Sequence, residues 1–188
     1  MKKRIGFGLL TAAISIGAFL TTRAARGHVK GLYAASITQD EIEAAQTAWG
    51  EGLVAISTAY ASGADYKGIA QNVLDTLYGY TDGIVLFKPT LASKVPFRFT
   101  EAGAASYFIG GIMNEDNGFA LNTWTSVRFG DDGNYIYNGD TALWMGSVFL
   151  TDAAGAETKV EKTMGYYRAE DGSVKLQVHH SSLPYVSA

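Results

Sequence analysis

The chain of 188 residues is 47% hydrophobic and carries a formal charge of −3, so it is long and apolar enough to bury one sizeable core. It has no cysteine, which excludes a disulfide framework and the thiolate ligands that often hold structural zinc. Its 11 tyrosines and 9 phenylalanines favour a strand-rich body over a helical bundle.

The first 27 residues have the pattern of a leader. Three basic residues at positions 2–4 precede an apolar run over residues 5–20, which is the order of a secretory signal. No small-x-small cleavage site follows the run, so an uncleaved amino-terminal membrane anchor is the alternative. We therefore expect a periplasmic or secreted protein that contacts the membrane only through an uncleaved leader. The rest, residues 28–188, is expected to form a single domain.

Removal of the leader makes the domain strongly acidic. Five basic residues lie within it, so ten basic and 18 acidic side chains remain, a formal charge of −8. A surface of this sign repels the phosphate backbone, and we expect no nucleic-acid partner.

A helix is predicted from Ile37 onward, and its start is specified twice. Thr38 and Glu41 have the spacing of a capping box, while Ile37 and Ile42 occupy the hydrophobic-staple positions. Apolar residues then recur along one helical face, at Ile42, Ala45, Trp49, Leu53, Ile56 and Tyr60.

Two glycines interrupt this helix, and a second helical stripe follows it. Gly50 and Gly52 each cost about 1 kcal/mol relative to alanine, so we expect close packing or a slight bend there. The second stripe consists of Tyr66, Ile69, Val73, Leu77 and Tyr80. We interpret both stripes as faces that pack on the core.

From residue 84 the period changes to that of strands. Strand-like segments are predicted at residues 119–129, 141–150, 158–167 and 174–182, with a tight hairpin turn at 131–134. The short connections at 152–155 and 170–172 make their neighbours antiparallel. The predicted fold class is α+β, with the amino-terminal helices packed on a curved, mainly antiparallel sheet.

The segment at 141–150 is apolar or small on both alternating faces, so we expect both faces to be covered. The helices cover one face. A second subunit is the simplest cover for the other, and we expect a homodimer.

The last segment places polar groups at the end of an apolar strand. One alternating face consists of Val174, Leu176, Val178, His180 and Ser182, and the other of Lys175, Gln177, His179 and Ser181. Because the first face is apolar until its last two members, we predict that His180 and Ser182 point inward. The alternative is that they are a hydrogen-bonded core histidine and a strand-end hydroxyl.

A histidine-based metal site is not predicted. Neighbouring residues on a strand point to opposite faces, so His179 and His180 cannot easily bind one ion. The third histidine of the chain, His28, borders the leader.

Three motifs occur in a characteristic order: Phe87-Lys88-Pro89-Thr90, Ser106-Tyr107-Phe108-Ile109-Gly110-Gly111 and His179-His180-Ser181-Ser182. With them, residues 40–185 resemble the iota-class carbonic anhydrases. That family has the cone-shaped fold of nuclear transport factor 2 and of the association domain of calmodulin-dependent kinases. The resemblance implies this NTF2-like fold and the reversible hydration of carbon dioxide to bicarbonate.

The resemblance also implies site residues. A threonine, a tyrosine and a serine line the pocket in the family, and by motif position they correspond to Thr90, Tyr107 and Ser182, the last preferred over Ser181. Some members work without a metal ion, whereas others are described as metal-dependent. Val178 stands where a third histidine is expected, so we expect no cofactor, with zinc or manganese as the alternative.

Metal-free hydration needs donors aimed at the oxygens that gain negative charge. The hydroxyls of Thr90, Tyr107 and Ser182 supply such donors, and we assign proton movement to His180 because its reference pKa is near neutrality. Without zinc to lower the pKa of water, we expect a slower enzyme than the zinc classes. If segment 119–129 turns inward, the pocket also includes Asn122, Trp124 and Ser126; otherwise these form a mixed packing face.

Two other functions of the same fold remain open. It serves as a non-catalytic oligomerisation module and as a binding cone for small ligands, including steroid isomerases. No Asp or Glu occupies a clear inward strand position, which disfavours isomerase chemistry. Convergence of Thr90, Tyr107 and Ser182 would favour the enzyme over the oligomerisation module.

Overall fold

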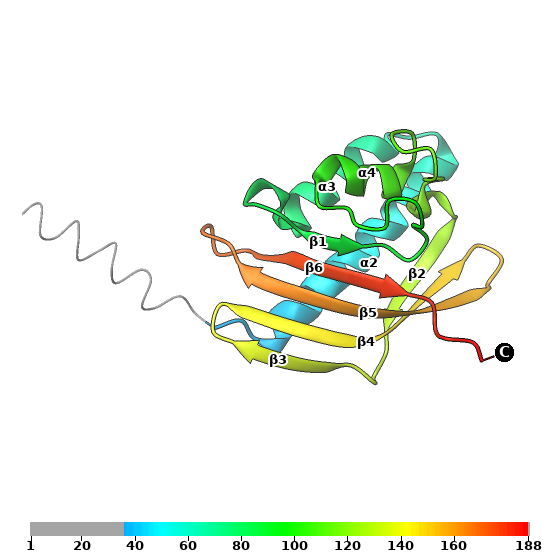
Figure 1. Ribbon diagram of the computed structural model, residues 1–188. Helices are drawn as coiled ribbons and strands as arrows, with labels where there is room; N and C mark the ends of the chain where they lie inside the picture. The colour runs from blue at the N-terminus through cyan, green and yellow to red at the C-terminus, as the bar shows by residue number, and fades with distance from the viewer. Residues whose placement is uncertain (1–35, 188) are drawn as a thin grey trace, which may run out of the picture. The chain divides into compact units, whose positions relative to one another are not determined.

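The computed structural model describes residues 36–187, whose arrangement is shown in Figure 1. In chain order the elements are α2 (Gln39–Ser62), α3 (Tyr66–Leu77), the 3₁₀ helix η1 (Gly79–Thr81), β1 (Leu86–Lys88), α4 (Glu101–Ile109), the 3₁₀ helix η2 (Phe119–Leu121), β2 (Trp124–Phe129), β3 (Asn134–Asn138), β4 (Thr141–Asp152), β5 (Glu157–Arg168) and β6 (Val174–Ser182). The leader predicted at residues 1–27 lies outside this range. None of the helices within 36–187 combines the length and apolar content needed to cross a bilayer.

Helix α2 starts where the sequence predicts. The Thr38 hydroxyl accepts the Glu41 backbone N–H, and the Glu41 carboxylate accepts the Thr38 N–H at 2.9 Å, so the capping box is confirmed. Arg168 of β5 pairs with the same carboxylate at 2.8 Å. This hydrogen bond is the main reason that the pKa of Glu41 falls to about 2. The helix is thereby tied to the sheet at its first turn.

The two glycines of α2 allow close packing, as predicted. A Cβ atom at Gly52 would lie 2.7 Å from a methyl carbon of Val73 on α3, and one at Gly50 would lie 3.0 Å from Val127 on β2. Both distances are too short for an ordinary contact. The missing side chains therefore let α2 lie against its neighbouring helix and the sheet without breaking the helix.

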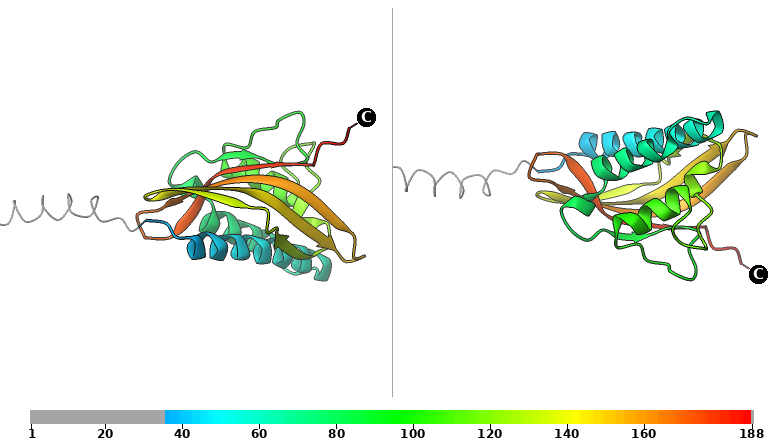
Figure 2. Two further views of the ribbon diagram at one scale, coloured as in Figure 1. Left: turned by 90° about the horizontal axis from the view of Figure 1, so that it is seen from below. Right: turned by 90° about the horizontal axis from the view of Figure 1, so that it is seen from above.

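The sheet has the order β1-β6-β5-β4, with β2 and β3 both paired to β4. β1 runs parallel to β6, and the other pairs are antiparallel. Figure 2 shows that the sheet is curved and that α2 and α3 lie along the same side of it. The α+β fold class predicted from the sequence is confirmed.

The connection between β2 and β3 is not the predicted tight hairpin. The two strands do not pair with each other; β2 pairs with the end of β4, and β3 with its beginning. The Asp132 carboxylate accepts the Ser147 N–H at 3.0 Å and the Ser147 hydroxyl at 2.6 Å. These bonds hold the connection against β4. The turn-forming residues therefore link two strands that pair with different parts of β4, and they do not form a hairpin. Strand β2 also begins only at Trp124, after η2.

Strand β6 contains a β-bulge at Gln177. Gly165 of β5 pairs with Val178, whereas the next residue, Tyr166, pairs with Leu176. Gln177 is therefore an extra residue without a partner on β5. One inserted residue reverses which side chains face the core for the rest of the strand.

The bulge overturns the predicted orientation of the histidine-serine segment. His179 and Ser181 are each 1% exposed and lie on the inner face, whereas His180 is exposed and Ser182 is half-buried. The prediction that His180 and Ser182 point inward was wrong. Strict alternation from Val174 cannot reveal an inserted residue, because the insertion depends on pairing with β5.

Strand β4 has a buried face and an apolar exposed face. Its core side consists of Ala142, Trp144, Val148 and Leu150. On the opposite side Leu143 and Met145 are 46% and 63% exposed, and Ile136 of β3, which pairs with Leu143, is 67% exposed. We call Ile136, Leu143 and Met145 the outer patch.

Candidate active site

A small cavity of about 10 Å³ lies between the helices and the inner face of the sheet. Its lining consists of Trp49, Phe87, Pro89, Thr90, Tyr107, Phe108, Phe119, Lys162, His179 and Ser181. The wall is mostly aromatic, and the polar groups gather on the side formed by β1, β5 and β6. Such a cavity suits a very small molecule that must be held by a few directed hydrogen bonds.

The end of β1 brings Thr90 to Ser181. Strand β1 pairs with β6 up to Lys88, and Pro89, which has no backbone N–H, ends the ladder. The Thr90 hydroxyl then donates to the Ser181 hydroxyl at 2.7 Å. The Lys88 ammonium donates to the Ser181 carbonyl at 3.0 Å and holds the two strand ends together.

A buried chain of polar groups continues from Ser181 toward α2. Lys162 Nζ lies 3.3 Å from the Ser181 hydroxyl and 2.8 Å from Nε2 of His179. The other ring nitrogen of His179 lies 2.8 Å from the Tyr78 hydroxyl, which accepts the Trp49 indole N–H at 2.9 Å. Aromatic rings fix the imidazole, with Phe87 stacked at 5.0 Å and Trp49 edge-on at 5.5 Å.

Burial shifts the pKa values of the titratable groups in this hydrogen-bonded series. It lowers the pKa of Lys162 to about 7. Burial and the charge of Lys162 hold the pKa of His179 well below its ordinary value, and burial raises that of Tyr78 well above its own. Near neutral pH, His179 and Tyr78 are therefore neutral. Among the residues that line the cavity there is no carboxylate to pair with a charged Lys162.

Tyr107 is placed by α4, a helix that the sequence analysis did not predict. Thr100 caps its start by accepting the Gly103 N–H, and Gly110 and Gly111, with φ of 74° and 90°, end it in the left-handed region that favours glycine. The Tyr107 hydroxyl is buried and has no hydrogen-bond partner in the described structure. Burial raises the pKa of Tyr107 to about 12, partly offset by the nearby Leu91 backbone and Thr90, so this hydroxyl keeps its proton at neutral pH.

The structure brings together only part of the predicted set. Thr90 and Tyr107 line the cavity, and the serine beside them is Ser181. Ser182 and His180 lie on the other side of β6, where burial and the charge of Lys88 lower the pKa of His180. His180, the predicted proton carrier, therefore lies outside the cavity, and the buried histidine is His179.

The segment that carries Thr90 is held by a carboxylate clamp. Glu115 accepts the backbone N–H groups of Ser93, Lys94 and Val95 at 2.8–2.9 Å. These bonds lower the pKa of Glu115 to about 2. Their contribution is present above the ordinary pKa of a glutamate and is lost as the pH falls toward 2.

Arg98 ties this clamp to α4. Its buried guanidinium contacts Glu115 at 3.1 Å and Asp116 at 2.8 Å, and Asp116 also accepts the Ser106 hydroxyl of α4 at 2.6 Å. The segment after β1 and the helix that carries Tyr107 are thus held by one ionic network.

A neighbouring cavity shares part of its wall with the inner cavity. It has a volume of about 70 Å³ and is lined by Leu91, Tyr107, Glu115, Asp116, Asn117, Gly118, Phe119 and Asn122. Tyr107 and Phe119, whose rings stack 5.3 Å apart, line both cavities. Of the residues predicted on segment 119–129, Asn122 lines this neighbouring cavity, Trp124 is buried and Ser126 is exposed.

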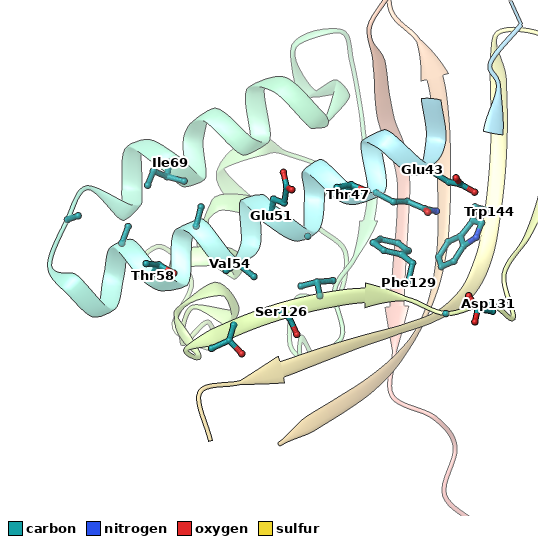
Figure 3. Close-up of a pocket in the computed structure, with 18 of the residues that line it drawn as sticks. Glu43, Thr47, Glu51, Val54, Thr58, Ile69, Ser126, Phe129, Asp131 and Trp144 are labelled. Atoms are coloured by element: carbon teal, nitrogen blue, oxygen red, sulfur yellow. The ribbon is translucent and has the colours of Figure 1, made fainter. Parts of the chain in front are cut away.

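A much larger groove, of about 970 Å³, lies between α2 and strands β2 and β3 and is shown in Figure 3. Its charged lining groups are the carboxylates of Glu43, Glu51 and Asp131. Negative charge disfavours an anionic ligand, and the Thr90 and Ser181 hydroxyls do not reach this groove. The small inner cavity is therefore the better candidate site.

Lys162, His179 and Tyr78 were not predicted as site residues. A signal for Lys162 was present, because it alternates with Val160, Met164 and Tyr166 and so shares their buried face. A lysine on an apolar strand face is unusual enough to mark a site. His179 was assigned to the outer face. Tyr78 follows the last turn of α3 and is not a member of the predicted helical stripe.

Within residues 36–187, no three side chains of His, Cys, Asp or Glu lie close enough together to hold a metal ion.

The comparisons first define the class of fold. A putative dehydratase of the NTF2-like family from Streptomyces avermitilis aligns with a TM-score of 0.51 and 16% identity, over 78% of this chain and 96% of that one. The iota-carbonic anhydrase from a cyanobacterium, solved in complex with bicarbonate, aligns with a TM-score of 0.78 and 44% identity, over 81% and 95%. The fold is thus NTF2-like, as predicted.

Residues 40–183 match the family described as metal-independent carbonic anhydrase. A metal-independent carbonic anhydrase from Nostoc sp. (strain PCC 7120 / SAG 25.82 / UTEX 2576) is 49% identical over 155 residues, which cover 80% of this chain and 75% of the relative. The chain belongs to the metal-independent carbonic anhydrases. It is therefore a lyase of a family that works without a metal cofactor, and the zinc or manganese alternative is set aside.

Proposed function

We propose that this chain interconverts carbon dioxide and bicarbonate in the inner cavity, with Thr90, Tyr107 and Ser181 as the hydroxyls that hold the reacting groups. The observation that carries the proposal is the Thr90–Ser181 hydrogen bond of 2.7 Å inside a buried cavity that also contains the unpaired Tyr107 hydroxyl. The bicarbonate complex of the 44% identical relative supports the same ligand here.

The geometry suits the charge that develops in hydration. As water adds to the carbon, one oxygen of carbon dioxide becomes negative, and preorganised donors in a water-excluded site stabilise such charge strongly. The Tyr107 hydroxyl is buried without a partner, so it pays no cost of breaking a bond before it donates. The aromatic wall excludes bulk water and suits the apolar substrate.

The two neighbouring serines provide a matched test. Ser181→Ala is expected to lower the hydration rate by roughly a hundredfold to a thousandfold, because it removes a hydroxyl from the polar side of the cavity. Ser182→Ala makes the same chemical change one residue later, outside the cavity, and is expected to leave the rate nearly unchanged. Stopped-flow hydration assays measure both. Equal rates for the two variants, or a larger loss in Ser182→Ala, would contradict the proposed site.

We also propose a homodimer that covers the outer patch. Ile136, Leu143 and Met145 expose apolar side chains side by side on β3 and β4, and an exposed cluster of this kind is typical of an interface. Strand β4 is apolar on both faces, and the exposed apolar face supports this proposal.

Light scattering tests the assembly. The described domain is expected to have the mass of a dimer, and Met145→Glu is expected to shift it to a monomer, because a carboxylate would be buried without a partner. Ile84→Glu is the control, since Ile84 is 71% exposed but lies outside the outer patch. A wild-type monomer at micromolar concentration would refute the dimer.

A further inference from the structure

The inner cavity contains a side chain whose chemistry the hydroxyl site does not explain. Lys162 is 4% exposed, and no carboxylate lines the cavity beside it. A buried ammonium without a counterion is costly, so such a lysine tends to stay neutral. The base that must accept a proton from water is the part of the hydration reaction still lacking a residue.

The hydrogen-bond donors in the buried series from Trp49 to Lys162 determine the protonation state of Lys162. The Trp49 indole nitrogen can donate a hydrogen bond but cannot accept one, so it donates to the Tyr78 oxygen at 2.9 Å. Within the described residues, the remaining hydrogen of Tyr78 has Nδ1 of His179 as its partner, at 2.8 Å. Neutral His179 then carries its hydrogen on Nε2, which lies 2.8 Å from Lys162 Nζ. An ammonium has no lone pair to accept that hydrogen, whereas an amine has one.

We propose that Lys162 is the general base of hydration, kept as a neutral amine and positioned by the chain of His179, Tyr78 and Trp49. This inference rests on the hydration reaction proposed above. Lys162 is the catalytic residue in it, because it lines the cavity, and the other three are positioning residues.

The step balances without any further reactant. The oxygen of a water molecule in the cavity forms a bond to the carbon of carbon dioxide while one of its O–H bonds breaks. The lone pair of Lys162 Nζ releases the Nε2–H of His179 and takes the proton, and one C=O electron pair of carbon dioxide moves onto oxygen. The products are bicarbonate and the Lys162 ammonium, two opposite charges in one buried cavity. When bicarbonate leaves, the ammonium returns its proton to water and the amine is restored.

Two features favour proton uptake at this position. Lys162 Nζ lies 4.5 Å from the centre of the Trp49 ring, whose face attracts the cation once it forms. Burial also brings the pKa of Lys162 to about 7, where a general base works best at neutral pH. Three other titratable groups near Lys162 are neutral at this pH: His179 on β6, Tyr78 after α3 and Tyr107 on α4. The Lys88 ammonium of β1 is bound to the Ser181 carbonyl.

The sign of the pH dependence separates a base from a cation that merely binds the product. A base must be neutral before it acts, so the rate of hydration is expected to rise with pH through about 7 and then level off. A lysine that worked only as a positive charge would give a rate that falls over the same range.

The test combines one variant with one titration. Lys162→Met keeps an unbranched apolar stem and leaves no buried charge. It is expected to slow hydration by roughly a hundredfold to ten-thousandfold and to abolish the rise through pH 7. In the wild-type protein, NMR of the lysine side chains is expected to show Lys162 titrating near pH 7, and added bicarbonate is expected to raise its pKa. The titration uses the wild-type protein, so it tests the protonation state of Lys162 even if Lys162→Met does not fold.

Each outcome has a distinct meaning. An active wild type with a Lys162→Met rate within a few-fold, a Lys162 that stays charged up to pH 10, or a rate that falls through pH 7 would overturn the base and leave the hydration site standing. A wild type without hydration activity at any pH would overturn the proposed function and the base together.

Discussion

Replacing Tyr107 by phenylalanine is expected to lower the hydration rate by roughly a hundredfold to a thousandfold, or about 2.7–4 kcal/mol of transition-state stabilisation. The change deletes one oxygen and keeps the ring, which stacks on Phe119 at 5.3 Å. The deleted hydroxyl is the donor that has no partner in the described structure. Its pKa of about 12 keeps it protonated at neutral pH.

Stability is expected to change in the opposite direction. A buried hydroxyl without a hydrogen bond costs about 1–3 kcal/mol, so Tyr107→Phe should be as stable as the wild type or more stable. Lower activity with equal or higher stability identifies a group retained for function rather than for folding. Urea unfolding and stopped-flow hydration on the same protein give both values.

Tyr166→Phe is the matched control. Tyr166 is also buried on the inner face of the sheet, but its hydroxyl is directed to the sulfur of Met164 and does not line the cavity. Its removal is expected to leave hydration within a few-fold of the wild type. If Tyr107→Phe hydrates as fast as Tyr166→Phe, Tyr107 is not a catalytic donor.

Local chemistry made the first helix and the last three strands predictable. The capping box of Thr38 and Glu41 depends on residues only three positions apart. The glycines of α2 indicate close contact because glycine is otherwise unfavourable inside a helix. Strands β4, β5 and β6 were found because each is a long segment of strand-like residues bounded by a short turn.

The parts that were missed depend on pairing between distant segments. Strand β1 has three residues and is defined by its parallel partner β6, some ninety positions later. The bulge at Gln177 exists only relative to β5, so the sequence of β6 alone gave the wrong inner face. The resemblance to the family supplied Thr90 and Tyr107, but the choice between Ser181 and Ser182 required that register.

Lys162 shows the opposite case. Its alternation with Val160, Met164 and Tyr166 was visible in the sequence, and a lysine on such a face is either paired or neutral. Histidines are commoner proton carriers, and the sequence places two of them on β6. A buried lysine without a carboxylate is as informative as a histidine, because its pKa also moves toward neutrality.

The largest expected loss of stability comes from Arg98→Met. The Arg98 side chain is 0% exposed and the Asp116 side chain 1%, and removing the guanidinium leaves the Asp116 carboxylate buried with the Ser106 hydroxyl as its remaining side-chain partner. Breaking a buried pair in this way typically costs about 3–5 kcal/mol, which corresponds to a fall in Tm of roughly 6–20 °C for a domain of this size. Chemical and thermal unfolding monitored by circular dichroism measure this effect.

Arg128→Met makes the same substitution in a pair with the opposite environment. Arg128 and Glu157 lie 3.7 Å apart with side chains 58% and 49% exposed, so the cost is expected to be at most about 1 kcal/mol. The Arg98 network joins the segment after β1 to α4, which together place Thr90 and Tyr107. Hydration by Arg98→Met is therefore expected to fail at a lower temperature than in Arg128→Met, in step with unfolding. Similar stability in the two variants would show that the buried network does not hold the site together.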